Sequence, residues 1–154
     1  MKNEKLKLLQ PYIGSWKTEG KTVDGDIICG TDVYEWLTGG FFLSHKVDVS
    51  MGKEKVNSLE ITYYDDMDDV FRSQSFDHDG NISISTLRII DDIILIFADN
   101  QRFQGHFKAG IIEGTWEQFD GQEWQLWMNI MLTKQKEPAA IKNHMEQVNE
   151  INNN

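Results

Sequence analysis

The chain has 154 residues, of which 40% are hydrophobic and 11% aromatic, and its net charge is -10. This length suits one domain with a substantial apolar core, so intrinsic disorder is disfavoured. Nucleic acid and anionic membrane surfaces are disfavoured as partners, because both are bound through clusters of Lys and Arg. The composition therefore indicates a single globular domain, and any small ligand is expected to be neutral, apolar or cationic.

The cysteine content and the hydropathy pattern bear on the cellular compartment. Cys29 is the single cysteine, which excludes an intrachain disulfide and fits a reducing compartment. The first residues lack the uninterrupted apolar stretch of a secretory signal, and no apolar run approaches the length of a membrane span. We therefore expect a cytoplasmic protein.

The first predicted element is a short helical turn, in which Leu6, Leu8 and Leu9 lead to Tyr12-Ile13 and Pro11 limits the length. From Trp16 onward the apolar residues recur with a period of two. Turn signals such as Asp24-Gly25 follow at short, regular spacing. No intervening segment is long enough for a helical crossover between parallel strands. The pattern predicts an all-β, antiparallel, up-and-down barrel of about ten strands.

The clearest predicted strand covers residues 41–51. One face carries His45 among the apolar residues Phe41, Leu43, Val47, Val49 and Met51. If this face is the inner one, His45 could bond a ligand, bind a metal or haem, or act as a base. The alternative is a core histidine that hydrogen-bonds a neighbouring tyrosine or carboxylate.

For two neighbouring segments, the sequence does not decide which face points into the barrel. Glu60 lies in a run where either Glu60, Thr62 and Tyr64 or the alternate residues face inward, and periodicity favours the second arrangement. With the first arrangement, Glu60 would meet His45 and form a candidate acid–base pair. Asp32 and Tyr34 are equally ambiguous: they are either inward polar anchors or members of a solvated or structural network.

The last predicted strand alternates Trp124, Leu126, Met128, Ile130 and Leu132 on one face with Trp127 and Met131 on the other. An outward apolar pair needs a cover. Residues 138–154 have apolar residues at helical spacing, so we expect a C-terminal helical tail that follows a barrel domain of residues 1–137. The tail either packs over the outward pair or forms a homodimer interface.

Several segments resemble ligand-binding motifs without meeting their requirements. Asp77, Asp79 and Asn81 match the first calcium positions of an EF-hand, but Ile82 stands where its glycine is required and Arg88 where its glutamate is required. A hairpin turn explains Asp79-Gly80 better. The single cysteine and scattered histidines give no zinc spacing, so no metal site is predicted. A phosphate-binding loop, a dinucleotide fingerprint and a nucleophile elbow are also missing.

Gly14-Ser15-Trp16, placed after a helical turn, resembles the motif that opens the first strand of lipocalins and other calycins. Three further blocks strengthen the likeness, which runs from about residue 8 to 133: Tyr34 to Leu43, Ser75 to Gly80, and Gly114 to Glu117. Together they resemble a bacterial lipocalin-like family of unknown function. The resemblance implies a closed or nearly closed barrel and no established activity.

The barrel is also similar to that of haem-binding nitrobindin-like proteins, which use a histidine near the end of the barrel as the iron ligand. The last predicted strands here contain no histidine, and His144 lies in the tail. No cofactor is therefore predicted, with haem held by His45 as an alternative.

The leading functional hypothesis is a barrel that binds a small apolar or aromatic molecule. Trp16 is assigned to structure at the closed end. The rivals are a calycin-type isomerase or lyase that uses His45 and Glu60, and a filled barrel that acts as an interaction or structural protein. The residues expected to line the cavity are Phe41, Leu43, His45, Val47, Trp116 and Met128, with Tyr34 and Trp36 near its mouth.

Overall fold

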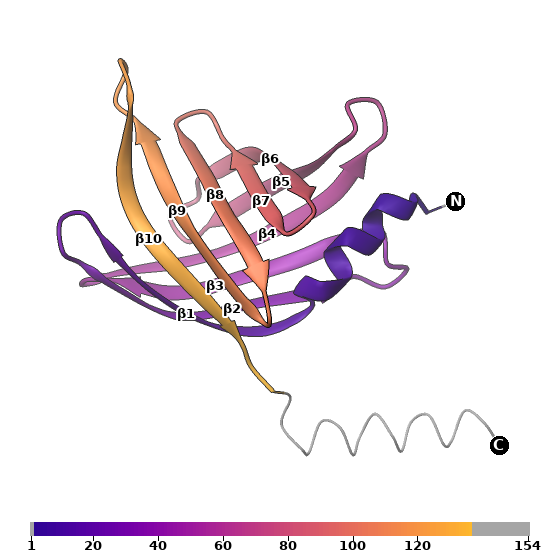
Figure 1. The fold of residues 1–154 in the computed structure, drawn as a ribbon, viewed down its shortest axis with the longest axis horizontal. Coiled ribbons are helices and arrows are strands. Elements are labelled where there is room, and N and C mark those ends of the chain that lie inside the picture. The colour runs from indigo at the N-terminus through magenta and orange to yellow at the C-terminus, as the bar shows by residue number, and fades with distance from the viewer. Residues whose placement is uncertain (1, 137–154) are drawn as a thin grey trace.

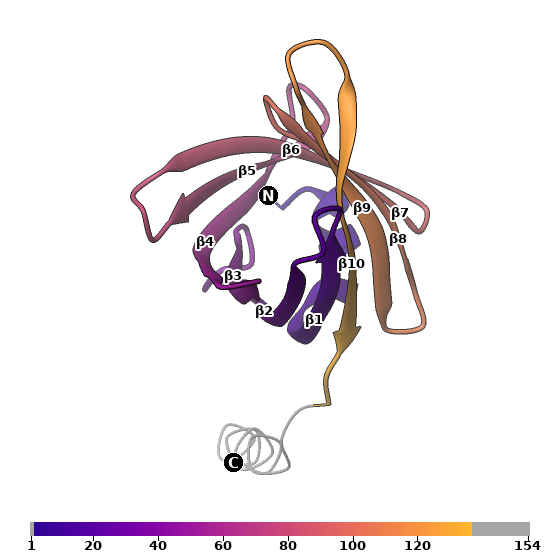
Figure 2. The same cartoon turned by 90° about the vertical axis from the view of Figure 1, so that its left-hand side faces the viewer.

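The computed structural model describes residues 2–136 and forms a closed antiparallel barrel of ten strands, which confirms the predicted fold class. Each strand pairs with its neighbours in the chain, and β1 closes the barrel by pairing with β10 (Figures 1 and 2). The strands are β1 (Gly14–Thr22), β2 (Ile27–Trp36), β3 (Leu43–Met51), β4 (Glu54–Asp65), β5 (Val70–Asp77), β6 (Ile82–Ile90), β7 (Ile93–Phe97), β8 (Gln101–Lys108), β9 (Ile111–Phe119) and β10 (Trp124–Lys134).

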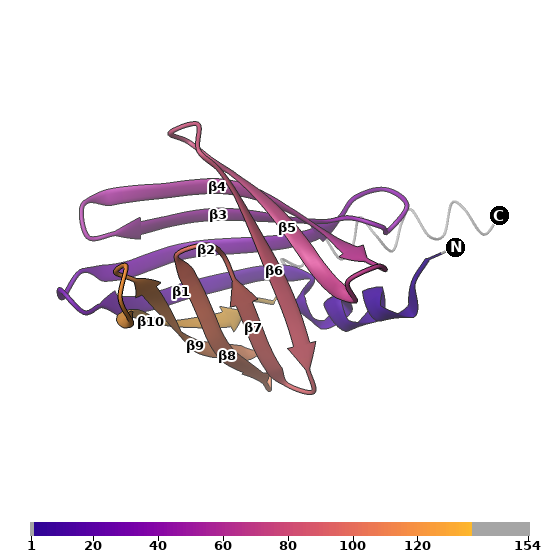
Figure 3. The ribbon, with the colours of Figure 1, turned by 90° about the horizontal axis from the view of Figure 1, so that it is seen from above.

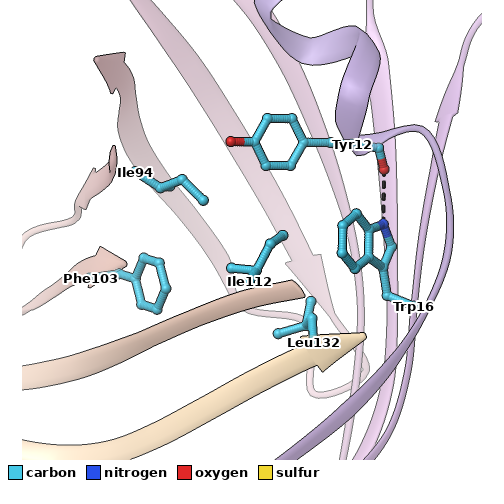
Figure 4. Close-up of a cluster of buried hydrophobic side chains, with 6 residues drawn as sticks. All are labelled: Tyr12, Trp16, Ile94, Phe103, Ile112 and Leu132. Atoms are coloured by element: carbon cyan, nitrogen blue, oxygen red, sulfur yellow. Dashed lines mark hydrogen bonds between the residues drawn. The ribbon is translucent and has the colours of Figure 1, made fainter. Parts of the chain in front are cut away.

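The helical segment η1 (Glu4–Tyr12), a 3-10 helix, lies across one end of the barrel, as the sequence predicted (Figure 1). Trp16 is completely buried beneath it, and its indole Nε1 donates a hydrogen bond to the Tyr12 carbonyl oxygen at 2.9 Å (Figure 4). Tyr12 and Trp16 pack in one apolar cluster with Ile94, Phe103 and Ile112 from the opposite wall. The first Gly-X-Trp motif therefore joins the helical cap to the barrel.

Further contacts hold the cap in place. Leu6 and Leu9 pack in a second buried cluster with Leu43 and Phe71. The Lys134 ammonium at the end of β10 donates to the Pro11 carbonyl oxygen at 2.9 Å. The end that carries η1 is thus sealed by apolar packing and hydrogen bonds, and the opposite end is formed by the hairpin turns that follow β1, β3, β5, β7 and β9.

Residues 58–63 of β4, 73–76 of β5 and 82–85 of β6 reverse the usual polarity of a barrel wall. Their hydroxyl-bearing residues face inward, and large apolar side chains on the other face remain exposed. Ile82 and Ile84 are 62% and 64% exposed, and Phe76 is 42% exposed. In Figure 3, β5 and β6 run diagonally in front of β3 and β4. The inward side chains are Ser58, Thr62, Ser73, Ser75, Ser83 and Ser85.

A register shift between Leu126 and Met128 marks a β-bulge in β10. An extra residue in one strand moves the following side chains to the other face. Trp127 consequently faces the interior beside Met128, while Leu126 points outward and is 46% exposed. The prediction that Trp127 lies on the outer face was wrong, because strict alternation does not allow for the bulge.

The pairing between β6 and β7 is short. It joins only residues 86–90 of β6 to residues 93–97 of β7. The first part of β6, residues 82–85, is hydrogen-bonded to β5 alone. At the end opposite η1, residues 82–85 of β6 therefore have an unpaired edge on their β7 side, which we call the notch.

The predicted helical tail, residues 138–154, lies outside the described residues. Within residues 2–136, no helix has both the length and the apolar character needed to cross a membrane.

Candidate functional site

The barrel interior holds a cavity of about 390 Å³ that extends from η1 to Met51, Ala98 and Gln101 at the opposite end. Because η1 seals one end, we infer that the mouth lies at the other. The floor of the cavity is formed by Leu9 and Tyr12 of the cap. This internal space argues against the completely filled barrel that was one of the alternatives. The apolar wall comes mainly from β7 to β10: Ile94, Ile96, Phe103, Ile112, Trp116, Met128, Ile130 and Leu132.

A cluster of charged side chains from β2, β3 and β4 lies on the facing wall. His45 Nε2 is 2.6 Å from Asp32 Oδ1, and His45 Nδ1 is 3.3 Å from Glu60 Oε1. The second oxygen of Asp32 accepts a hydrogen bond from the Thr18 hydroxyl of β1. Asp32 is almost fully buried, whereas Glu60 keeps a side-chain exposure of 27% and reaches the cavity.

The antiparallel register places this cluster. Tyr34, His45 and Glu60 are direct cross-strand partners on β2, β3 and β4, and the row continues to Ser75 of β5 and Ser83 of β6. Side chains directly opposite one another on one face of a sheet lie close enough to interact. A row of polar side chains therefore crosses five strands of the cavity wall, and further polar residues such as Asp32, Thr62 and Ser73 flank it.

Both carboxylates favour a protonated His45. Burial by itself would lower the pKa of His45, but the hydrogen bonds and negative charges of Asp32 and Glu60 raise it from 6.5 to about 9. An ionised carboxylate is only an acceptor, so both ring nitrogens of His45 must donate. At neutral pH the cluster is thus an imidazolium held between two carboxylates.

Tyr34 completes the cluster. Its ring stacks on the His45 ring with centroids 4.0 Å apart and an angle of 10° between the planes, which fixes the imidazolium orientation. Burial raises the pKa of the Tyr34 phenol well above 10, and the charges of Asp32 and Glu60 add to this effect. Tyr34 is therefore a neutral hydrogen-bonding group in the cavity wall.

The structure places most of the predicted lining residues at the cavity. His45 and Tyr34 face it, together with Leu43, Val47, Trp116 and Met128. Tyr34 lies toward the capped end, packed with Tyr12, and not near the mouth as expected. The favoured facing of Glu60 was wrong: Glu60 and Thr62 point inward, while Leu59 and Tyr63 point outward. Periodicity failed here because β4 carries the apolar residues next to Glu60, such as Leu59 and Tyr63, on the outer face.

Phe41 and Trp36 do not line the cavity, which corrects two expected ligand contacts. Phe41 precedes β3 and is 45% exposed, with the Lys2 ammonium 5.4 Å from its ring centroid. Trp36 ends β2 at the capped end, and its indole Nε1 donates to Gln10 of η1 at 2.9 Å. Both residues therefore lie at the closed end of the barrel, away from the mouth.

Some lining residues were not found by sequence reasoning. The inward serines of β6 alternate with Ile82 and Ile84, and that alternation was the available signal. It was not used, because the usual expectation places the apolar set inside. Thr18 and the bulged Trp127 carried no comparable signal in the sequence.

The site does not fit the haem alternative. An iron ligand needs a ring nitrogen with a free electron pair, and both nitrogens of His45 are directed at carboxylates. Within residues 2–136, no group of three or more His, Cys, Asp or Glu side chains has a metal-binding arrangement. The Asp77 carboxylate instead accepts backbone hydrogen bonds from Asp79 and Asn81, as expected of a hairpin turn.

No family model matches the chain, and no curated protein sequence matches it. Among solved structures it is similar to a redesigned β-barrel, mFAP1, bound to DFHBI, with a TM-score of 0.47, 11% identity, and coverage of 86% of this chain and 100% of that chain. It is also similar to the S-type phycobiliprotein lyase CPES from Guillardia theta, with a TM-score of 0.45, 9% identity, and coverage of 86% and 93%. These values carry no functional argument, and the lipocalin-like family stays a prediction.

Proposed function

We propose that this protein binds a small, largely apolar molecule inside the barrel. The observation that supports the proposal is the internal cavity, with the buried Asp32–His45–Glu60 cluster on one wall and an apolar wall opposite. Binding sites for small molecules commonly combine a mostly apolar lining with a few convergent polar groups. The apolar wall supplies burial, and the cluster with Tyr34 fixes the orientation of the ligand.

Native mass spectrometry of the purified protein, with an absorbance scan, is the first test. We expect a bound small molecule that is released on denaturation. Val47→Trp should abolish binding, because Val47 lines the cavity at the centre of β3 and a larger side chain would fill the space. Lys46→Trp is the matched control, since its exposed side chain lies on the outer face of the same strand.

Two results would count against the binding function. One is a protein that carries no ligand and takes up none from a library of apolar compounds. The other is equal ligand occupancy in the wild type and in Val47→Trp, which would place the ligand outside the cavity.

An acid–base enzyme is the second candidate, because the structure brings His45 and Glu60 together. With its raised pKa, His45 would serve at neutral pH as a proton donor rather than as a base. Substrates of isomerases and lyases should then lose turnover in His45→Ala and in Glu60→Gln. Unchanged turnover in both variants would end this hypothesis.

A further inference from the structure

The charge balance of the cavity constrains what it can hold. The only charged side chains in its lining are Asp32, His45 and Glu60, and no Lys or Arg of residues 2–136 reaches it. With both ring nitrogens of His45 donating, the two carboxylates leave one negative charge in excess. A ligand carboxylate would therefore meet repulsion in a poorly solvated space, where charge interactions are strong.

Glu60 is the carboxylate left with bonding capacity. Both oxygens of Asp32 are engaged, one with His45 and one with Thr18. Glu60 uses only Oε1, in a long contact with His45, and no hydrogen bond to its Oε2 occurs within the described part of the chain. A donor group from a ligand can satisfy this oxygen without disturbing the cluster.

A wall of hydroxyl groups continues from Glu60. Ser75 is its direct partner on β5, and Ser83 is the next residue in the row on β6. A serine hydroxyl can accept a hydrogen bond as well as donate one. An N–H group that reaches Glu60 would thus find further acceptors beside it. Opposite this wall lie the ring of Phe103 and the indole of Trp116, 5.2 Å apart between centroids.

We propose that the ligand is an organic monocation, an amine with an apolar or aromatic body, whose ammonium group binds Glu60 and the adjacent serines while its body packs on Phe103 and Trp116. This inference rests on the proposed binding function and adds the charge class of the ligand. The ammonium neutralises the excess negative charge and supplies a charged donor for Glu60 Oε2, which accepts no hydrogen bond within the described part of the chain. Charge-assisted hydrogen bonds of this kind are among the strongest in proteins.

The test uses three probes that share one ring system: naphthylmethylamine, naphthylmethanol and naphthoic acid. Dissociation constants are measured by calorimetry with the full chain at neutral pH. We expect the amine to bind more tightly than the alcohol and the acid to bind most weakly. In Glu60→Gln the dissociation constant of the amine should rise on the order of tenfold to a hundredfold, whereas that of the alcohol should change little. Glu113→Gln, on the exposed outer face of β9, is the control.

The alcohol probe separates the two proposals. If the alcohol binds and Val47→Trp abolishes its binding, the cavity function holds, whatever the amine does. Equal affinity for amine and alcohol, tighter binding of the acid, or an amine affinity unchanged in Glu60→Gln would each overturn the cation inference. Retained alcohol binding in Glu60→Gln also shows that the variant is folded. Failure of every probe to bind the wild type would overturn the inference.

Discussion

At the scale of single residues, His45 decides the character of the site. The pattern of β3 placed it correctly on the inner face. The alternative of a histidine satisfied by neighbouring carboxylates is confirmed, and a role of His45 toward a ligand stays a prediction. It is a histidine that carboxylates satisfy, and it also lines a cavity. What the sequence could not show was Asp32 as its closest partner, because Asp32 lies diagonally from His45 across β2 and β3, and either face of β2 was possible.

The raised pKa of His45 predicts how stability depends on pH. The folded value of about 9 exceeds the unfolded value of 6.5, so the folded state binds more protons between these values. The stabilisation is complete below pH 6.5 and is lost as the pH rises through 9. This shift corresponds to about 3 kcal/mol of unfolding free energy.

Urea denaturation at several pH values tests this prediction. The wild type should lose stability between pH 6.5 and 9, and His45→Gln should be nearly flat in that window. Parallel pH profiles for the two proteins would show that His45 is not protonated in the fold.

At the scale of elements, some features of the barrel could be predicted from the sequence and others could not. The helical turn, the turn signals and the closure between β1 and β10 follow from local patterns and from the Gly-X-Trp motif. The facing of β4 and of the first part of β10 did not follow. Glu60 lies on a strand with reversed polarity, and Trp127 lies at a bulge that alternation cannot detect.

The attachment of η1 to β1 should depend on the hydrogen bond that the Trp16 indole donates. Trp16→Phe keeps an aromatic ring but leaves the Tyr12 carbonyl oxygen without its donor. We expect a loss of about 1 to 3 kcal/mol of unfolding free energy, as for a buried polar group left unpaired. Trp124→Phe is the control, because that half-buried indole packs on the Arg102 guanidinium and on the Phe119 ring; its loss should stay below about 1 kcal/mol. Equal losses of unfolding free energy in the two variants would show that the hydrogen bond from Trp16 to Tyr12 makes no particular contribution to stability.

A pair of glycines makes room for Phe103. Gly105 and Gly114 are cross-strand partners on β8 and β9, and a Cβ at Gly114 would lie against the Phe103 ring and 2.7 Å from the Gln104 carbonyl oxygen. Gly114→Ala should therefore destabilise the protein by about 1 to 3 kcal/mol. Adding Phe103→Leu should recover part of this loss, which a double-mutant cycle by chemical denaturation measures. Strict additivity of the two changes would contradict the steric explanation.

At the scale of the whole molecule, the strands of the barrel differ in how completely they are hydrogen-bonded to their neighbours. Residues 112–116 of β9 are paired on both sides, whereas residues 82–85 of β6 are paired on one side only. Backbone amides with few neighbours open with low free energy. Hydrogen exchange followed by mass spectrometry should show faster exchange in the β6 segment than in β9. Equal protection of the two segments would mean that another group covers the edge of β6.

The notch beside β6 has a consequence for kinetics. Ser83 and Ser85 line the cavity from this poorly held segment, so an outward movement of the segment would widen the mouth without loosening the sealed cap. We therefore expect the residence time of a ligand to depend on the β6 rim, while its affinity depends on the deep cluster around His45. A protein built in this way can change how quickly it exchanges a ligand without changing how much of it is bound at equilibrium.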